Sequence, residues 1–222
     1  MNYLYSLLLS LTVVATSCGE PTATTEPGPA TDNEEAAGAA GEESAPNEET
    51  YTFVPGRRFG AIPTGAGLEE VEKIYGDAFE AGTLPGPEGT TYEGYYLFKD
   101  TDQEVQATYM PGRRFTVLVD RNNSPWHDPK TGLRIGTTLE ELIEINGAPI
   151  DFYGFGWDYG GNVINLNEGT LDGLVGLRLK VDDDFEFTAE QEGGTLGDQE
   201  LRSDRLVVPT DRIRVSQMVV FL

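Results

Sequence analysis

The stretch GTTLEELIEING (residues 136–147) repeats the stretch GAGLEEVEKIYG (residues 65–76) without a gap, 71 residues further along the chain. In both, Leu-Glu-Glu begins a short amphipathic segment and a glycine stands at each end. Apolar residues at helical spacing predict a helix that buries one face. Thr138 and Glu141 have the spacing of a capping box, and Gly147 ends the segment. Helices this short need a sheet to pack on, so the repeat predicts a duplicated small α+β unit.

Strand-like segments follow both predicted helices, because apolar and polar residues alternate there with a period of two. These segments are 92–99, 104–109 and 113–120 after the first helix, and 151–159, 162–166, 174–181 and 213–222 after the second. Short turns, with Gly160-Gly161 the clearest, favour hairpins. The predicted fold is therefore α+β, with two tandem helix-plus-antiparallel-meander repeats, 51–127 and 128–222. Together they would form a curved sheet with the short helices on one face.

The second repeat is longer because residues 182–210 separate its last two strands. This segment contains nine acidic and two basic residues. We expect an acidic excursion loop that carries a short strand at 206–208. Loops of this length in compact domains are either functional or disordered, and the sequence leaves both open.

The N-terminus has the features of an export signal. Residues 4–14 form an apolar run that is too short to span a bilayer but suits a signal peptide, here residues 1–17. The motif Ala15-Thr-Ser-Cys18 resembles the bacterial lipobox, which implies cleavage before Cys18 and attachment of lipid to it. An unlipidated secreted protein is the alternative, since Ala15-x-Ser17 also suits ordinary signal peptidase. We expect an exported lipoprotein anchored in the outer membrane of a Gram-negative bacterium, with the N-terminal lipid as its only membrane contact.

Charge is distributed unevenly along the chain. Residues 19–50 contain nine acidic and no basic residues and show no apolar periodicity, which predicts that lipidated Cys18 and the segment up to residue 50 form a disordered tether. All 15 Lys and Arg residues lie in 51–222, together with 29 of the 38 acidic residues, and the formal net charge of the chain is −23. A field of this sign argues against nucleic acid as a partner.

The repeated unit resembles that of the beta-lactamase-inhibitor-protein-like fold, and that of the small lipoprotein of the outer-membrane barrel-assembly machinery. The resemblance lies in the order glycine, short Leu-Glu-Glu helix, terminating glycine and meander. Residues 130–161 are also similar to exported lipoproteins of Bacteroidota. The resemblance implies a concave sheet face open to another protein and no catalysis, and it transfers no inhibitory residue to this chain.

Residues 151–159 form the most aromatic segment. Alternation along a strand would place Tyr153, Phe155, Trp157 and Tyr159 on one face. Such a stripe is either core beneath the helices or an exposed contact surface. The position of Trp157 distinguishes the possibilities: burial means a structural role, exposure on a flat surface favours a protein partner, and exposure in a pocket favours a small ligand.

Four basic residues are expected to point outward from two neighbouring strands: Arg178, Lys180, Arg212 and Arg214. The inward residues of the last strand would be Ile213, Val215, Val219 and Phe221. The outward residues form either a basic binding stripe or cross-strand pairs with Asp and Glu.

Catalytic and metal-binding patterns are weak. His127 is the only histidine, and no recognisable nucleophile motif surrounds Ser124, Ser203 or Ser216. Residues 120–124 begin like a calcium loop, but Pro125 replaces the turn glycine. The acidic run 182–184 is more typical of a solvated turn. We expect no enzymatic activity, no cofactor and no metal.

The sequence thus predicts a cell-envelope lipoprotein with a non-catalytic protein-binding domain, scaffold-like or inhibitor-like, whose partner is another envelope protein. The alternative is a module that binds a small ligand or glycan through the aromatic strand. The candidate binding residues are Tyr153, Phe155, Trp157, Tyr159, Arg178, Lys180, Arg212 and Arg214.

Overall fold

The computed structural model describes residues 51–109 and 115–222, all of which lie in the unit Ser44–Leu222. The predicted signal peptide, the lipidation site Cys18 and the tether lie outside the described residues, as does the beginning of the predicted strand 113–120. None of the helices in the described part of the chain has the length and hydropathy needed to cross a membrane.

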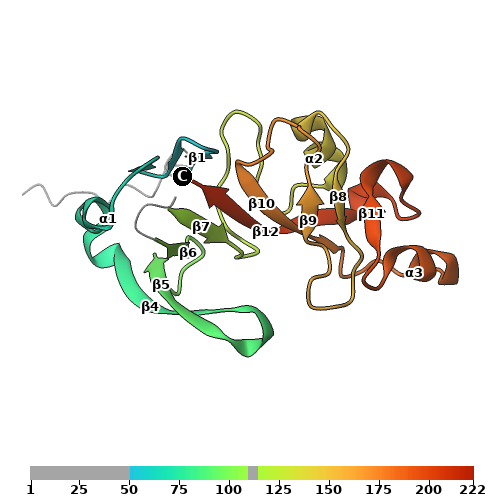
Figure 1. The fold of residues 1–222 in the computed structure, drawn as a ribbon, viewed down its shortest axis with the longest axis horizontal. Coiled ribbons are helices and arrows are strands. Elements are labelled where there is room, and N and C mark those ends of the chain that lie inside the picture. Colours follow the sequence, from blue (N-terminus) through green and yellow to red (C-terminus); the bar gives the residue numbers. More distant parts are fainter. Residues whose placement is uncertain (1–50, 110–114) are drawn as a thin grey trace, which may run out of the picture. The chain divides into compact units, whose positions relative to one another are not determined.

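Strands dominate the described chain and short helices accompany them (Figure 1). The α-helices are α1 (Leu68–Tyr75), α2 (Leu139–Asn146) and α3 (Ala189–Thr195). The strands are β1 (Phe53–Val54), β2 (Arg58–Phe59), β3 (Ile62–Pro63), β4 (Phe79–Pro85), β5 (Thr91–Leu97), β6 (Val105–Thr108), β7 (Thr116–Val119), β8 (Asp151–Tyr153), β9 (Val163–Asn165), β10 (Val175–Val181), β11 (Glu200–Arg202) and β12 (Ile213–Phe221). The 3-10 turns are η2 (Gly76–Ala78), η3 (Pro87–Gly89), η4 (Ser203–Arg205) and η5 (Thr210–Arg212). The α+β class is confirmed, with curved, open sheets.

Both predicted helices are present, and their first residues are Leu68 and Leu139. In α2 the Thr138 hydroxyl accepts a hydrogen bond from the Glu141 N–H, and the Glu141 carboxylate accepts one from the Thr138 N–H. This reciprocal pair is the predicted capping box. Gly147 ends α2 with a left-handed φ of 73°. In α1 no side chain caps the first turn.

The largest sheet has the strand order β10-β12-β7-β6-β5-β4, and each neighbouring pair is antiparallel. Strands β4 to β7 form the meander expected after the first helix. The sequence analysis does not predict β4, because the alternation of apolar and polar residues in this segment is too weak. Strand β12, from the end of the chain, pairs with β7 on one side and β10 on the other. The two halves therefore share one sheet.

The second half does not form a single meander, contrary to the prediction. Strand β8 pairs with β9 and with β11, which makes a separate three-stranded sheet. Both edges of β8 are thereby occupied, so it cannot join β10. The acidic excursion supplies β11 and also α3, which Thr188 and Gln191 cap reciprocally. The excursion is therefore ordered, and the strand predicted at 206–208 does not form.

The inward residues of β12 also differ from the prediction beyond Val215. The pairing of β10 with β12 shifts by one residue, so that Arg178 faces Gln217 while Leu179 faces Val215. The extra residue, Ser216, reverses the alternation. As a result Met218 and Val220 are fully buried, while Val219 and Phe221 are only partly buried.

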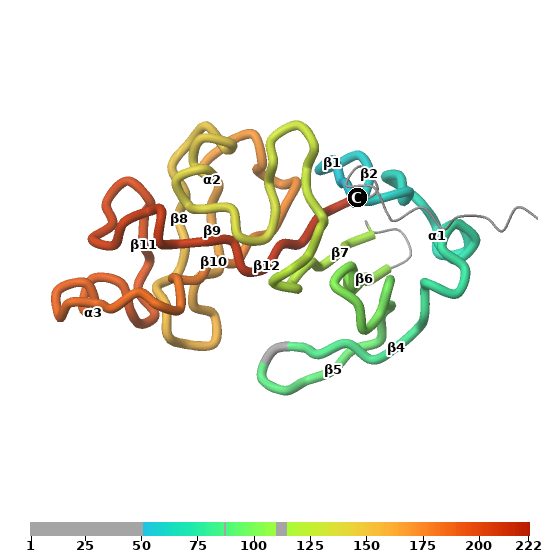
Figure 2. Tube along the Cα trace, turned by 180° about the vertical axis from the view of Figure 1, so that it is seen from behind, coloured from blue at the N-terminus to red at the C-terminus, as the bar shows by residue number. Residues whose placement is uncertain are grey.

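The core is a continuous apolar cluster that includes residues of both halves, such as Trp126 and Phe152. The β4–β5 hairpin extends beyond the other strands of the first half (Figure 1). Its turn points away from α1, on the side of the loop that joins β8 to β9 (Figures 1 and 2).

Candidate functional site

The aromatic segment is a strand only as far as Tyr153, so the predicted strand 151–159 is wrong beyond that residue. Gly156 has a φ of +86°, which interrupts extended backbone. Gly154 approaches the excursion so closely that an added Cβ would lie 2.6 Å from the carbonyl oxygen of Gly197. Residues 154–161 consequently form a loop, which we call the aromatic loop.

The four aromatic side chains separate into two groups because of this loop. Phe155 is 8% exposed and its ring packs 5.8 Å from that of Phe152, so it belongs to the core. Tyr153, Trp157 and Tyr159 form a ladder of edge-on contacts, with ring centroids 5.5 and 5.4 Å apart. Trp157 is half-buried and Tyr159 is 40% exposed, so the ladder faces solvent at its Tyr159 end.

Arg178 holds the aromatic loop in place. Its Nε donates to the carbonyl oxygen of Gly160 at 2.9 Å, and its Nη2 donates to that of Asp158 at 2.8 Å. The backbone N–H of Leu179 donates to the carbonyl oxygen of Gly161 at 2.8 Å. The loop is therefore fixed to the outer edge of β10 through its backbone carbonyl groups, while the side chains of Asp158 and Tyr159 remain exposed.

The other three basic candidates contact the acidic run 182–184. Arg214 donates from Nε to Asp182 at 2.6 Å, and this hydrogen bond raises the pKa of the Arg214 guanidinium. Arg212 lies in η5 and donates to Asp184 at 2.6 Å. Lys180 lies 3.3 Å from Asp183. These contacts are the pairing alternative of the sequence analysis, and they occupy the carboxylates of the run.

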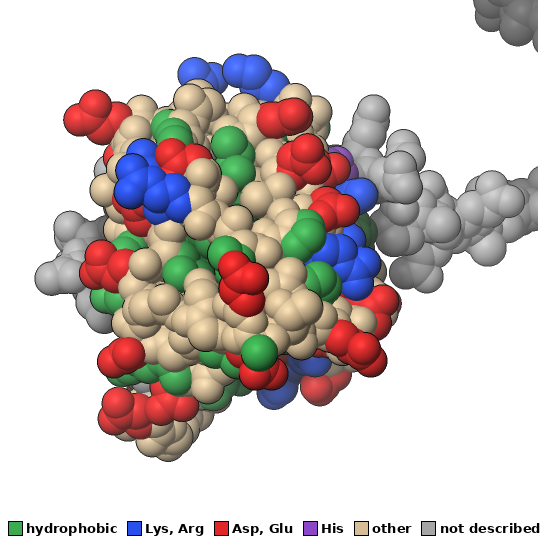
Figure 3. All heavy atoms as spheres, turned by 90° about the vertical axis from the view of Figure 1, so that its right-hand side faces the viewer, with side chains coloured by type: hydrophobic (Ala, Val, Ile, Leu, Met, Phe, Trp, Pro, Cys, Tyr) green, Lys and Arg blue, Asp and Glu red, His purple; other side chains and the backbone are tan. Residues whose placement is uncertain are grey.

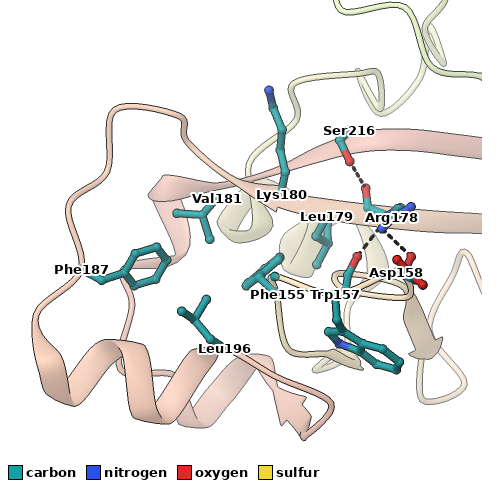
Figure 4. Close-up of a pocket in the computed structure, with 12 residues that line it drawn as sticks. Phe155, Trp157, Asp158, Arg178, Leu179, Lys180, Val181, Phe187, Leu196 and Ser216 are labelled. Atoms are coloured by element: carbon teal, nitrogen blue, oxygen red, sulfur yellow. Dashed lines mark hydrogen bonds between the residues drawn. The ribbon is translucent and has the colours of Figure 1, made fainter.

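Two hollows flank the Trp157–Asp158 segment. The larger hollow has a volume of about 600 Å³ and lies between the aromatic loop, β10 and α3. Its apolar side chains are Phe155, Leu179, Val181, Phe187 and Leu196. Phe187, Val181 and Leu196 point toward one another across it, while Lys180 points away (Figure 4). Leu196 is 37% exposed.

The smaller hollow has a volume of about 510 Å³ and is more polar. It is lined by Glu88, Gly89, Trp157, Asp158, Tyr159 and Arg178. Glu88 comes from the turn of the β4–β5 hairpin, and the Tyr159 hydroxyl donates to its carboxylate at 3.4 Å. The first half of the domain thus contributes a wall to a site of the second half.

Acidic side chains are scattered over the face that carries α3 and β11, and a few groups of basic side chains lie among them (Figure 3). Within the described residues, no group of three or more His, Cys, Asp and Glu side chains is arranged to hold a metal ion. His127 is half-buried and its Nδ1 donates to the carbonyl oxygen of Pro125 at 2.9 Å. Ser203 accepts from the backbone of Ile150, and Ser216 donates to that of Arg178.

Comparison of the chain with family models, with curated proteins and with solved structures found no significant match. The site is therefore interpreted from its own geometry.

Sequence reasoning identified Tyr153, Trp157, Tyr159 and Arg178 but missed Glu88, Phe187 and Leu196. The Pro-Gly-Pro-Glu-Gly run at 85–89 is a turn signal that indicates a hairpin. Nothing local to either segment indicates that this turn lies beside the aromatic loop.

Proposed function

We propose that the domain is a non-catalytic binding module whose ligand is a glycan or a similar small polar molecule. The observation that carries this proposal is the position of Trp157, which is partly exposed and lies between two hollows. A pocketed aromatic residue favours a ligand of small cross-section over a flat protein interface.

The smaller hollow has the chemistry that a sugar requires. A sugar ring presents C–H groups on its face and hydroxyls around its edge, and aromatic rings such as those of Trp157 and Tyr159 suit the face. The carboxylates of Asp158 and Glu88 can accept hydrogen bonds from hydroxyls. The guanidinium of Arg178 uses the N–H of Nε and one N–H of Nη2 to hold the loop, so the N–H groups of Nη1 and the second N–H of Nη2 can donate to the ligand.

A glycan array that includes N-acetylglucosamine oligomers tests this proposal, with binding of the full chain compared between Tyr159→Ala and Tyr92→Ala. Tyr92 is the matched control because it is 41% exposed, against 40% for Tyr159, and lines neither hollow. We expect the Tyr159 variant to lose about tenfold in affinity, in line with the loss of one stacking ring, and the Tyr92 variant to bind like the wild type. An array without signal, or equal loss in both variants, contradicts the proposal.

The larger hollow favours a second candidate function, the binding of another envelope protein. Its side chains Val181, Phe187 and Leu196 are apolar and partly exposed, and it is open to solvent. Apolar side chains around a concavity can receive an anchoring side chain from a partner.

Recovery of partners from envelope extract by the full chain tests this candidate with Leu196→Ser and Ile164→Ser. Ile164 is the control because it is 40% exposed, against 37% for Leu196, and lies on β9 outside the hollow. Reduced recovery of one protein by the Leu196 variant alone supports the candidate. Equal recovery by both variants would show that the larger hollow does not contact the partner protein. The variant Phe155→Ala is unsuitable, because Phe155 is a core residue.

We further propose that the protein is exported and anchored in the outer membrane of a Gram-negative bacterium through lipid on Cys18. The support is the sequence of residues 1–18. Growth with labelled palmitate tests the anchor: label in the wild type and none in Cys18→Ser is expected, and label in both contradicts it.

The proposal of a tandem repeat related to the beta-lactamase-inhibitor-protein-like fold draws support from α1 and α2, whose first residues are 71 positions apart and which both end at a glycine. The meander after α1 adds to this support. The split of the later strands between two sheets does not support the proposal of a tandem repeat.

A further inference from the structure

Another hollow lies between the segment 127–137 and helix α2, and we call it the α2 hollow (Figure 2). Its volume is about 410 Å³, which is large enough for a small molecule. None of the residues that line it lines either hollow beside Trp157. The α2 hollow is therefore a separate candidate site.

The two walls of the α2 hollow carry opposite charges. His127 and Arg134 lie on the wall formed by the segment 127–137, where they face each other in an antiparallel bridge and so share one face. Glu141 and Glu144 lie on the wall formed by α2, and residues three apart are neighbours on a helix surface. An imidazole and a guanidinium thus stand across the hollow from two carboxylates.

These charges do not neutralise each other by direct contact. The hydrogen bonds from Thr138 lower the pKa of the Glu141 carboxyl most, and the charge of Arg134 lowers it further, yet no ion pair joins Arg134 to Glu141. Among the described residues, the side chains of Arg134 and Glu144 have no hydrogen-bond or ion-pair partner. The Nδ1 of His127 is held by the carbonyl oxygen of Pro125, which leaves Nε2 available.

The position of Glu144 is unfavourable for the helix that carries it. Glu144 lies in the last turn of α2, where the helix dipole disfavours a carboxylate, and it neighbours Glu141, which has the same charge. This turn contains no basic residue. A charge that weakens its own element without an evident compensating contact is expected at a functional position.

We infer that the α2 hollow binds a small zwitterion, a free amino acid or a short peptide, with its ammonium group at Glu144 and its carboxylate at Arg134. An ammonium group donates three hydrogen bonds and suits the carboxylates of α2. A guanidinium binds a carboxylate through two parallel hydrogen bonds. The opposite charges of the two walls orient the ligand, and this site does not depend on the proposed glycan binding.

Titration of the full chain with alanine and with alanylalanine, followed by the NMR signals of the His127 ring, tests this site. His127 is the only histidine, so its ring signals are unambiguous. We expect a saturable shift of these signals. Saturation at lower concentration by alanine assigns the site to free amino acids, and saturation at lower concentration by alanylalanine assigns it to short peptides.

Blocked peptides test whether both charges of the ligand are needed. N-acetyl-alanylalanine lacks the ammonium group, and alanylalanine amide lacks the carboxylate. Each should bind about tenfold more weakly than alanylalanine, because each loses one charged contact.

Matched variants test the two walls. Arg134→Gln and Glu144→Gln should each lower the affinity for the zwitterion about tenfold. The controls Lys130→Gln and Glu140→Gln should bind like the wild type, because these exposed charges lie on the same two segments but do not line the hollow. Without ligand, Glu144→Gln should unfold at the same or a higher urea concentration than the wild type, whereas a purely structural role of Glu144 predicts a lower one.

Three results would overturn the inference. The first is the absence of a saturable shift with either compound at concentrations up to about 10 mM. The second is equal affinity for alanylalanine and for the two blocked peptides, since the charges at its ends would then play no part. The third is an equal loss of affinity in the variants of the two walls and in their controls.

Discussion

Asn146, the last residue of α2, links three segments through its side chain. It is 1% exposed, and its Nδ2 donates to the carbonyl oxygens of Leu166 at 2.8 Å and Ala148 at 3.1 Å. Its Oδ1 accepts from the N–H of Leu171 at 3.3 Å. An amide is the side chain that can satisfy donors and acceptors together here.

We predict that Asn146→Ala lowers the free energy of unfolding by about 3 kcal/mol, because it leaves buried backbone groups without partners. Urea unfolding followed by circular dichroism measures the effect. Asn122→Ala, in an exposed turn, is the control and should change stability by less than about 0.5 kcal/mol. Similar losses in the two variants would mean that the buried network contributes nothing specific.

The ends of α2 show how local sequence determines an element. The hydrogen bond from the Thr138 backbone N–H, and then that from its hydroxyl, lower the pKa of the Glu141 carboxyl. A carboxyl whose pKa is lower in the folded state stabilises the fold above its ordinary pKa, and this contribution is lost as the pH falls through the folded value.

The capping box therefore predicts a pH-dependent effect of Glu141→Gln. At neutral pH the variant should unfold at lower urea concentration than the wild type. The difference should shrink as the pH is lowered through the folded-state pKa of Glu141, which lies below the ordinary value, because the carboxyl then becomes protonated in the folded state as well. Urea unfolding of the two proteins over a series of pH values, from neutral downward, is the measurement. A difference that stays constant with pH would show that charge on Glu141 does not act through the cap.

The attachment of the aromatic loop to β10 gives a second prediction at this scale. Gly161 has a φ of +77°, and an added Cβ would overlap the carbonyl oxygen of Leu179, whereas Gly132 has a φ of +78° with open space around it. In both alanine variants the left-handed backbone lowers the free energy of unfolding by about 1 kcal/mol. Only Gly161→Ala must also detach the aromatic loop from β10. We expect a total loss of about 3 kcal/mol or more for Gly161→Ala. Equal losses in urea unfolding would contradict this attachment.

Elements with strong local signals could be predicted from the sequence, namely α1, α2 and the strands 92–99, 104–109 and 174–181. The rest depended on tertiary contacts. The end of β8 at Tyr153 follows from the close packing of Gly154 against the excursion, and the reversal at Ser216 follows from its pairing with β10. Alternation alone does not reveal either contact.

At the scale of the whole molecule, β12 joins the two halves by pairing with β7 and β10. We predict that the halves unfold together, since β12 is paired with a strand of each half and the apolar core cluster is continuous between them. The two tryptophans allow a direct measurement, because Trp126 lies in the first half and Trp157 in the second. Each of the variants Trp126→Phe and Trp157→Phe keeps one tryptophan. In each variant, the urea midpoint measured by tryptophan fluorescence should coincide with the midpoint measured by circular dichroism. Separate fluorescence transitions would show that the halves are independent.

The candidate site could be predicted only in part, for the same reason. The aromatic residues are close together in the sequence, and Arg178 lies on another strand of the same predicted repeat. Glu88 is 71 residues from Tyr159, and only the fold brings the two together. A site that spans both halves becomes apparent only once the sheet that unites them is known.

The central claim is that Trp157 lies at the wall of a glycan site. Titration of the Trp126→Phe variant, in which Trp157 is the only tryptophan, with the glycan that binds best on the array measures it most directly. The account predicts a saturable change in fluorescence. When Tyr159→Ala is combined with Trp126→Phe, the midpoint of this change should move to an about tenfold higher glycan concentration. Binding of the glycan with no change in Trp157 fluorescence, or the absence of any binding glycan, would contradict it.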